Sequence, residues 1–472
     1  MPAAVAGRRV NDLRIPLHGS GQSLYVAQEK VYPREVEGRF ARLRTLSVWA
    51  LLGIYYLFPW IEWHDRQAVL FDLPARKFFV FGLVFWPQDF IFLTLLLIIA
   101  ALALFFFTAV AGRLWCGYAC PQTVWTETFL WMERFTEGDR NARLRLDRGP
   151  WNPEKLLRKS AKQVLWVTFA LWTGFTFVGF FSPIRVLAGD VLALTLGPWE
   201  AFWILFYGFA TYGNAGYLRE QVCKYMCPYA RFQSAMFDRD TLVITYDEKR
   251  GEPRGARRRG TDPRAQGKGD CIDCTLCVQV CPTGIDIRKG LQIECIACAA
   301  CIDVCDDVMD KMGSPRGLIR YTTQHALEHK PTKVLRPRTL IYGLILAALT
   351  AGFVVAVALR SPASLDVIRD RNALYRLTDD GNVDNVYTIR ILNKSERVQR
   401  FVLEARGGSP LTLIAKQTEY LVPSGSVYSL PLRVRRAAYE PLGAETIVFT
   451  LRSLDDPDVT VETEARFLAP AR

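Results

Sequence analysis

Long apolar stretches alternate with polar segments through most of the chain. Each stretch comes close to the roughly 20 residues that an α-helix needs to cross a bilayer. Trp or Tyr stands near their ends, or arginines lie just outside, as is typical of membrane interfaces. The pattern predicts a polytopic α-helical membrane protein with about five transmembrane helices, at Leu46–Trp60, Phe90–Val110, Val164–Phe181, Val191–Tyr212 and Leu340–Leu359.

The pattern changes after the last apolar stretch. Short runs of β-branched residues recur there at intervals of about 8–12 residues, separated by turn residues such as Gly407 and Gly408. This rhythm predicts a C-terminal Ig-like β-sandwich. Residues 361–472 contain no Cys or His, so we expect the domain to dock a partner rather than bind a metal. The expected strands are Val386–Leu392, Val398–Ala405, Leu411–Ala415, Val427–Val434 and Thr446–Leu451.

The distribution of charge gives the chain an expected orientation. Its 472 residues carry a net charge of +12, although half of them are hydrophobic. Lys and Arg concentrate in the N-terminal arm, in 134–162 and in 219–338, whereas the loops near 66–77 and 185 hold few. Because cytoplasmic loops carry the excess of positive charge, the three basic segments are expected in the cytoplasm and the C-terminal domain outside. The Gly-, Pro- and Arg-rich run 247–270 lacks aromatic residues, which predicts a solvated linker and no nucleic-acid partner.

These patterns divide the chain into segments of different character. All twelve cysteines lie between residues 116 and 305, so the outer segments have no disulfide framework. The expected segments are a cytoplasmic N-terminal arm (1–45), a membrane domain with four helices (46–218), a cytoplasmic region (219–338), a fifth transmembrane helix (339–360) and a periplasmic Ig-like domain (361–472).

Eight of the twelve cysteines form two runs of equal spacing. The first reads C-x-x-C-x-x-C-x-x-x-C-P, and the second repeats it with Asp306 in place of the proline. Three cysteines at intervals of three hold one [4Fe–4S] cluster, and the fourth of each run ligates the other cluster. Zinc sites usually show a longer gap between two C-x-x-C pairs, and a reducing compartment disfavours disulfides. The spacing predicts a bacterial 2[4Fe–4S] ferredoxin-like domain, with one cluster on Cys271, Cys274, Cys277 and Cys305 and the other on Cys281, Cys295, Cys298 and Cys301.

The other four cysteines form two C-x-x-x-C-P pairs, each directly after an apolar stretch. Positions i and i+4 share one face of a helix, so two pairs at one membrane depth are expected to meet as a four-thiolate site. Soft thiolates select Cu(I), zinc or iron–sulfur, while the alternative is two unrelated pairs of buried free cysteines. His325 and His329 have the same spacing, but on a polar helix they are more often solvated than metal-bound. The candidate catalytic and copper-binding residues are Cys116, Cys120, Cys223 and Cys227.

With these motifs the chain resembles, over nearly its whole length, the cytochrome c oxidase accessory proteins of the FixG, RdxA and CcoG type. The second run lacks the final proline that bacterial ferredoxins have at this position, and members of this family lack it too. The resemblance implies a multi-pass protein of the bacterial inner membrane that holds two [4Fe–4S] clusters. It also implies reduction of Cu(II) to Cu(I) during maturation of the cb-type haem–copper cytochrome c oxidase. The most telling stretches are Tyr32–Arg44, Phe71–Lys77, Phe85–Asp89, Leu114–Trp125 and Cys301–Asp307.

Three functions are compared on this basis. In a cupric reductase, which we favour, a cytoplasmic donor of unknown identity supplies electrons that reach copper at or near the four C-x-x-x-C-P cysteines. The second hypothesis is a relay between quinol and another redox partner, as in the similar NapH-like ferredoxins. The third is a non-catalytic assembly scaffold. By resemblance, the expected partners are the lipid bilayer and either oxidase assembly factors or copper chaperones and transporters. The sequence leaves open whether the chain forms a homodimer.

Overall fold

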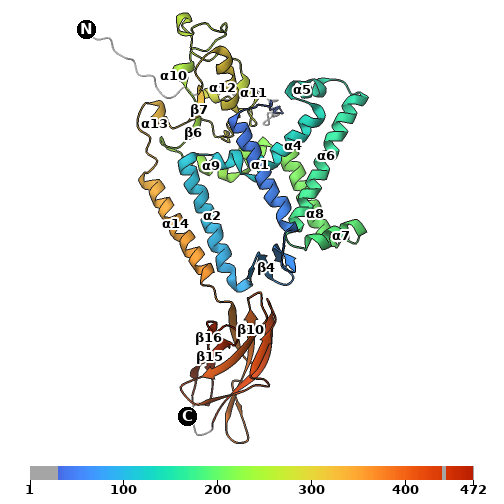
Figure 1. Cartoon of the computed structure of the whole chain (residues 1–472), viewed down its shortest axis with the longest axis vertical. Coiled ribbons are helices and arrows are strands. Elements are labelled where there is room, and N and C mark those ends of the chain that lie inside the picture. Colours follow the sequence, from blue (N-terminus) through green and yellow to red (C-terminus); the bar gives the residue numbers. More distant parts are fainter. Residues whose placement is uncertain (1–29, 438–442, 471–472) are drawn as a thin grey trace, which may run out of the picture.

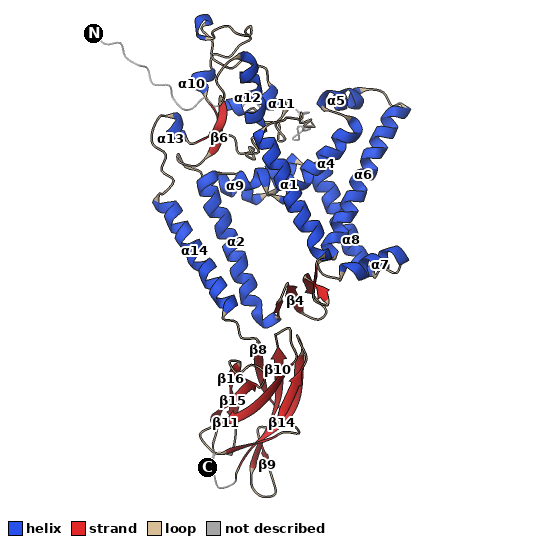
Figure 2. Cartoon of the chain, in the orientation of Figure 1, coloured by secondary structure: helices blue, strands red, loops and turns tan. Residues whose placement is uncertain are grey.

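The computed structural model describes residues 30–437 and 443–470, so the expected N-terminal arm lies outside the described residues up to residue 29. Three layers follow one another along the longest axis of the molecule (Figure 1). The cysteine-rich region lies at one end, long helices form the middle layer, and a β-sandwich forms the other end (Figure 2). The chain therefore separates its cysteines from its C-terminal domain by the full depth of the helical layer.

The helical layer consists of two groups of helices. Its members are α1 (Arg39–Leu57), α2 (Phe90–Ala111), α3 (Leu114–Tyr118), α4 (Pro121–Glu137), α5 (Arg140–Arg148), α6 (Pro153–Val178), α7 (Ile184–Ala193), α8 (Pro198–Thr211), α9 (Pro228–Ala235) and α14 (Pro337–Ala358). Helices α2 and α14 pack on each other, while α1, α4 and α8 pack around α6. Among the described residues, α2 and α14 are long and apolar enough to cross a membrane, and α7 with α8 adds a third span if this bent pair counts as one.

One expected transmembrane helix is wrong as a continuous helix. Within Val191–Tyr212, α7 ends at Ala193 and α8 begins at Pro198, so that the two helices are bent by 97°. Proline has no N–H and its ring clashes with the preceding turn, which prevents α7 from continuing. Two other expected spans are parts of longer helices. Helix α1 begins at Arg39, before the expected Leu46, and α6 begins at Pro153, directly after its N-cap residue Asn152. The five-span topology itself stays a prediction.

The segment between α1 and α2, expected as a short loop, folds into two small antiparallel sheets. Its strands are β1 (Glu62–Trp63), β2 (Arg66–Gln67), β3 (Val69–Asp72), β4 (Lys77–Val80) and β5 (Leu83–Phe85). Val84 and Trp86 pack against Leu392 of the C-terminal domain. Asp89, at the start of α2, pairs with Arg360 at 2.6 Å and with Lys394 at 3.2 Å. These contacts fix the C-terminal domain against the helical layer.

The C-terminal domain is an Ig-like sandwich of two antiparallel sheets, as predicted. One sheet has the order β12-β14-β10-β8, with β9 on β10, and the other has the order β13-β11-β15-β16. Between them lies a core with fully buried Tyr387, Phe401, Phe449 and Phe467. Each expected run falls on a strand, but β8, β9, β13 and β16 were missed, because they are short or interrupted by polar residues. The strands are β8 (Ala363–Arg369), β9 (Arg376–Leu377), β10 (Val383–Asn393), β11 (Gln399–Arg406), β12 (Leu411–Ile414), β13 (Glu419–Val422), β14 (Val427–Arg436), β15 (Glu445–Ser453) and β16 (Thr460–Phe467).

The cysteine-rich region has its own small core. Strands β6 (Val243–Tyr246) and β7 (Ile319–Thr322) pair antiparallel, beside helices α10 (Glu248–Gly251), α11 (Leu276–Gln279), α12 (Ala300–Met312) and α13 (Gln324–Leu327). The run 247–270, predicted as a solvated linker, folds back on this region. Gly255 N–H donates to the carbonyl of Cys271 at 3.0 Å, and Arg257 donates to the Ser314 hydroxyl at 2.7 Å.

Candidate functional site

The eight ferredoxin-type cysteines line two adjoining cavities. One, of about 370 Å³ and partly open to solvent, is lined by Cys271, Cys274, Cys277 and Cys305. The other, of about 340 Å³, is lined by Cys281, Cys295, Cys298 and Cys301, with Cys277 as a shared wall. The structure thus brings together each set of four that the spacing predicts, including the exchanged Cys281 and Cys305. Ligation of a cluster by each set stays a prediction.

The backbone beside both sets is shaped alike. Asp273 and Thr275 of the first run have φ of +55° and +56°, and Ala297 and Ala299 at the matching positions of the second have φ of +55° and +61°. Non-glycine residues rarely adopt this left-handed conformation, which persists where the surrounding structure imposes it and often marks functional sites. Alternating right- and left-handed residues turn successive N–H groups inward, and such nests bind the anionic sulfur of iron–sulfur sites.

The thiol chemistry of the first set also fits a cluster. Burial, together with the neighbouring Cys277, Cys271 and Cys274, raises the pKa of Cys305 to about 12. A thiol with such a pKa keeps its proton at neutral pH, whereas a metal-bound cysteine is a thiolate. As thiolates, four sulfurs in one low-dielectric cavity would need a strong positive centre among them, which the iron of a bound cluster would supply.

The four C-x-x-x-C-P cysteines lie near enough to influence one another electrostatically. Cys116 lies on α3 and Cys120 caps α4, while Cys223 lies in the π-helical turn Val222–Met226 and Cys227 precedes α9. Burial, together with the three other thiols, raises the pKa of Cys223 to about 12. Within residues 30–437 and 443–470, no three His, Cys, Asp or Glu side chains are grouped so that they could hold one metal ion. The copper site at these cysteines stays a prediction.

The four-thiol group lies directly against the second cavity. Cys116 and Cys223 pack on the same hydrophobic cluster as Cys298 and Ile296. A Cβ added at Gly117 would lie 2.7 Å from the carbonyl oxygen of Ala297, so only glycine allows this approach between α3 and the ferredoxin loop. Arg113 reinforces it by donating to backbone carbonyls of Ile293, Cys295 and Ala230.

Helix α1 is attached to the same region by its N-terminus. Asp303 of α12 accepts hydrogen bonds from the N–H groups of Phe40 at 3.2 Å and Ala41 at 2.7 Å, which satisfies two of the free donors at the start of the helix. One turn further, Arg44 donates to the carbonyl of Cys298 at 3.2 Å. No sequence pattern indicated these contacts, because Asp303 is simply a polar residue between Cys301 and Cys305.

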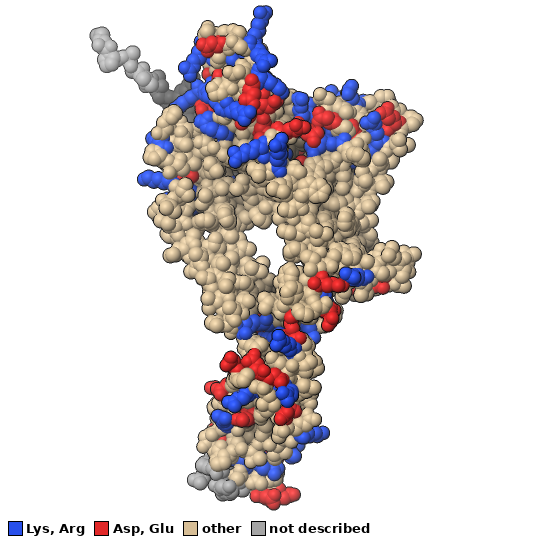
Figure 3. Space-filling model, in the orientation of Figure 1, with Lys and Arg blue, Asp and Glu red and all other residues tan. Residues whose placement is uncertain are grey.

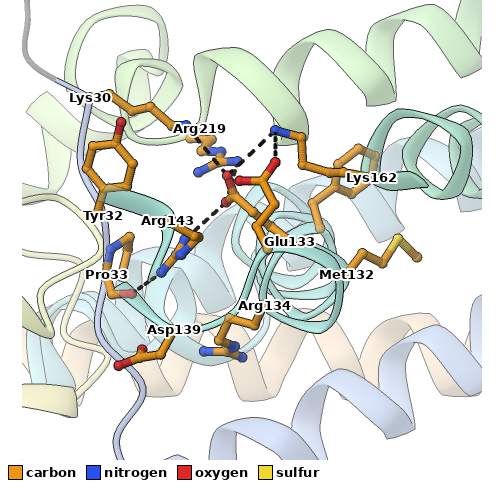
Figure 4. A network of polar contacts seen from close by, with 12 residues as sticks. Lys30, Tyr32, Pro33, Met132, Glu133, Arg134, Asp139, Arg143, Lys162 and Arg219 are labelled. Carbon is orange, nitrogen blue, oxygen red and sulfur yellow. Dashed lines mark hydrogen bonds and ion pairs between the residues drawn. The ribbon is translucent and has the colours of Figure 1, made fainter. Parts of the chain in front are cut away.

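A buried ionic network borders this site (Figure 4). Glu133 of α4 has no exposed side-chain surface and faces four cations, Arg219 at 2.9 Å, Arg143 at 3.1 Å, Lys30 at 3.6 Å and Lys162 at 3.9 Å. Burial alone would raise the pKa of Glu133, but these cations outweigh it and hold the pKa below its usual value. The network ties α4, α5, α6 and the N-terminal segment to Arg219, four residues before Cys223.

The histidine pair does not form one helical face. Helix α13 ends at Leu327, and His329 follows it with φ of +58°. His325 Nδ1 lies 2.8 Å from a carboxylate oxygen of Asp240. The expectation of two imidazoles on one helix is therefore wrong, because the helix stops before the second of them.

Known proteins are similar to most of this chain. A 4Fe-4S dicluster domain matches residues 218–324, a 4Fe-4S binding domain matches 93–137, and the IG-like fold at the C-terminus of FixG matches 353–470. Protein RdxB of Cereibacter sphaeroides is 44% identical over 406 residues, 83% of this chain and 85% of its own length. Nitrogen fixation protein FixG of Rhizobium meliloti is 41% identical over 428 residues, covering 83% and 82%. A crystal structure of a FixG-related protein from Vibrio parahaemolyticus is 33% identical, with a TM-score of 0.22, and covers 24% of this chain and all of its own.

Proposed function

We propose that this chain, which belongs to the FixG/RdxA family, is an iron–sulfur oxidoreductase of the bacterial cytoplasmic membrane that reduces Cu(II) to Cu(I). The two 4Fe-4S domains identify the protein as an iron–sulfur protein, and the nature of its acceptor is our inference. The observation that carries it is a line of cysteines from the surface to the helical layer, joined at its last step by the hydrophobic cluster on Ile296.

The series begins at Cys274, which is exposed and suits the docking of a cytoplasmic electron donor. It passes Cys277, which both ferredoxin cavities share. It then reaches Cys298 and, through the hydrophobic cluster on Ile296, ends at Cys116 and Cys223. Bound [4Fe–4S] clusters supply one-electron redox chemistry along this line, and the protein contributes position, burial and potential.

The surface supports a membrane location for the helical layer. Lys and Arg crowd the end that holds the cysteines, whereas the belt over the long helices is almost free of charge in Figure 3. The belt corresponds to exposed apolar side chains, among them Leu97, Phe107, Leu192, Phe209 and Leu344. We place the N-terminal segment and the cysteines in the cytoplasm, the C-terminal domain in the periplasm and five spans between them, in accord with the excess of positive charge on cytoplasmic segments.

Copper enters as substrate. Soft thiolates bind Cu(I) more favourably than harder ligands do, so a Cu(II) ion held at Cys116, Cys120, Cys223 and Cys227 gains affinity when it accepts one electron. Release of Cu(I) to a chaperone or an assembly factor then serves the cb-type haem–copper oxidase. The Ig-like domain lacks cysteine and histidine and offers a surface for docking that partner.

Replacement of Cys116 and Cys223 by serine tests the acceptor site. Full-length protein, purified without oxygen and reduced with dithionite, is mixed with Cu(II) and a Cu(I)-specific chromophore. We expect the double variant to form Cu(I) at least about tenfold more slowly than the parent, because it loses half of the soft ligands. Its iron content should stay unchanged. Reduction at the parent rate would exclude these thiols as the copper site.

A further inference from the structure

A second pocket opens beside Cys120 among the long helices. It has about 250 Å³ of space, partly open to the surroundings, which is close to the lower end of the usual range for small-molecule sites. Residues of α1, α4, α6, α8 and the following π-helical turn Tyr212–Leu218 form its walls. Pro121, which directly follows Cys120, is one of them. A molecule in this pocket therefore lies next to the four-thiol group.

The walls are mainly aromatic, with a polar edge. Tyr55, Trp125, Phe177 and Tyr207 supply ring surfaces, and the rings of Phe177 and Tyr207 lie 3.8 Å apart between centroids. Aromatic rings of this kind favour a flat, unsaturated ligand, which they contact by stacking. An acyl chain alone would use the apolar surface but not the polar edge.

Three polar side chains of the pocket lack intramolecular partners. Within the described parts of the chain, the hydroxyl groups of Tyr207 and Thr211 and the side-chain amide of Asn214 make no hydrogen bond. By contrast, Gln122 in the same pocket donates to the carbonyls of Asn214 at 2.9 Å and Arg219 at 3.1 Å. A polar group without a partner is costly where lipid replaces water. These three groups therefore indicate a ligand that brings its own hydrogen-bonding atoms.

We propose that this pocket binds the ring of a lipid-soluble quinone or quinol. A para-quinone combines a flat ring for the aromatic walls with two opposed oxygen atoms, which the Tyr207 hydroxyl and the Asn214 amide can hydrogen-bond. Its isoprenoid tail extends through the open side into the lipid. The inference rests on the proposed function, since it needs the helical layer to lie in a membrane and the four-thiol group beside the pocket to exchange electrons.

Photolabelling of the full chain tests the site. The probe is an azido-benzoquinone with a geranyl tail, added to anaerobically purified protein in phosphatidylcholine nanodiscs, and the labelled peptides are mapped by mass spectrometry. We expect labelling on α8 and on the start of α4, and its loss when decylubiquinone competes. The variants Tyr207→Phe and Tyr207→Phe/Asn214→Leu should reduce labelling, the double variant at least tenfold. Phe209→Leu, on the exposed side of the same helix, should not.

The outcomes separate this proposal from the proposed function. Labelling that is uncompeted, spread evenly over all helices or unchanged in both variants would overturn the quinone site. So would equal labelling of these peptides by a photoactivatable phospholipid that decylubiquinone does not displace, which would assign the pocket to lipid. Iron content and Cu(I) formation are measured on the same samples. If the parent protein contained no iron or formed no Cu(I), the proposed function would be refuted. If the parent contained iron and formed Cu(I) but was not labelled, only the quinone site would be refuted.

Discussion

Replacing Glu133 with alanine is expected to destabilise the full chain by about 3–5 kcal/mol, because four cations then share a buried space with too little negative charge. Glu133 has no exposed side-chain surface, and the nearest cations, Arg219 and Arg143, lie at 2.9 Å and 3.1 Å. Glu137 remains, but it already pairs with Lys162 at 2.8 Å and Lys159 at 3.0 Å. The substitution therefore removes the partner of two buried guanidinium groups.

Reversible denaturation in mixed detergent micelles measures this loss. The matched control is Glu154→Ala on α6, where an exposed carboxylate pairs with Arg158 one turn away at 2.9 Å. An exposed pair of this kind contributes about 0.5 kcal/mol or less. Equal stabilities of the two variants would contradict the role of Glu133 as the centre of the network. Because Arg219 lies four residues before Cys223, the Glu133 variant should also lose activity in Cu(I) formation.

Replacing Gly117 with alanine is expected to slow Cu(I) formation by on the order of 10- to 100-fold while the iron content stays at the parent value. The added Cβ would lie 2.7 Å and 2.8 Å from the carbonyl oxygens of Ala297 and Ile296. Both are backbone atoms of the ferredoxin loop, so the loop and α3 must move apart. The four-thiol group would then lose its contact with the second cavity, although no cysteine has changed.

Gly213 is the matched control for this substitution. It lies in the π-helical turn that precedes the second cysteine pair, and a Cβ there meets nothing within 4 Å. Gly213→Ala should therefore reduce copper as fast as the parent. Dithionite-reduced protein, Cu(II) and the Cu(I) chromophore give the rate, and iron analysis of the same samples shows whether the clusters remain. A parent-like rate in Gly117→Ala would show that close docking does not limit electron transfer.

Local spacing predicted much of the ferredoxin region and of the sandwich. The sets that line the two cavities follow from the intervals between cysteines. Alternating β-branched runs also placed strands correctly to within a few residues, as for Val427–Val434 within the strand Val427–Arg436. In both cases the signal lies in residues near each other in the chain, where the period of a strand or the reach of a loop fixes the outcome.

Contacts between distant segments could not be predicted in this way. Helix α1 begins where Asp303, 263 residues beyond Phe40, accepts its first N–H groups. The glycine in the first C-x-x-x-C-P pair reads as an ordinary small residue until Ala297 lies against it. The break before Pro198 was missed because hydrophobicity continues through it, although a proline inside an apolar run is itself a signal of a helix end.

The crossed ligation of two clusters is the central claim, and iron analysis of paired variants tests it most directly. Anaerobically purified parent protein, Cys271→Ala, Cys271→Ala/Cys305→Ala and Cys271→Ala/Cys281→Ala are compared. Cys271 and Cys305 line one cavity, whereas Cys281 lines the other. We predict that the first two variants each lose about four irons per chain, and that the pair with Cys281 loses about eight. A loss of about eight irons in Cys271→Ala/Cys305→Ala, with a loss of only about four in Cys271→Ala/Cys281→Ala, would contradict the account.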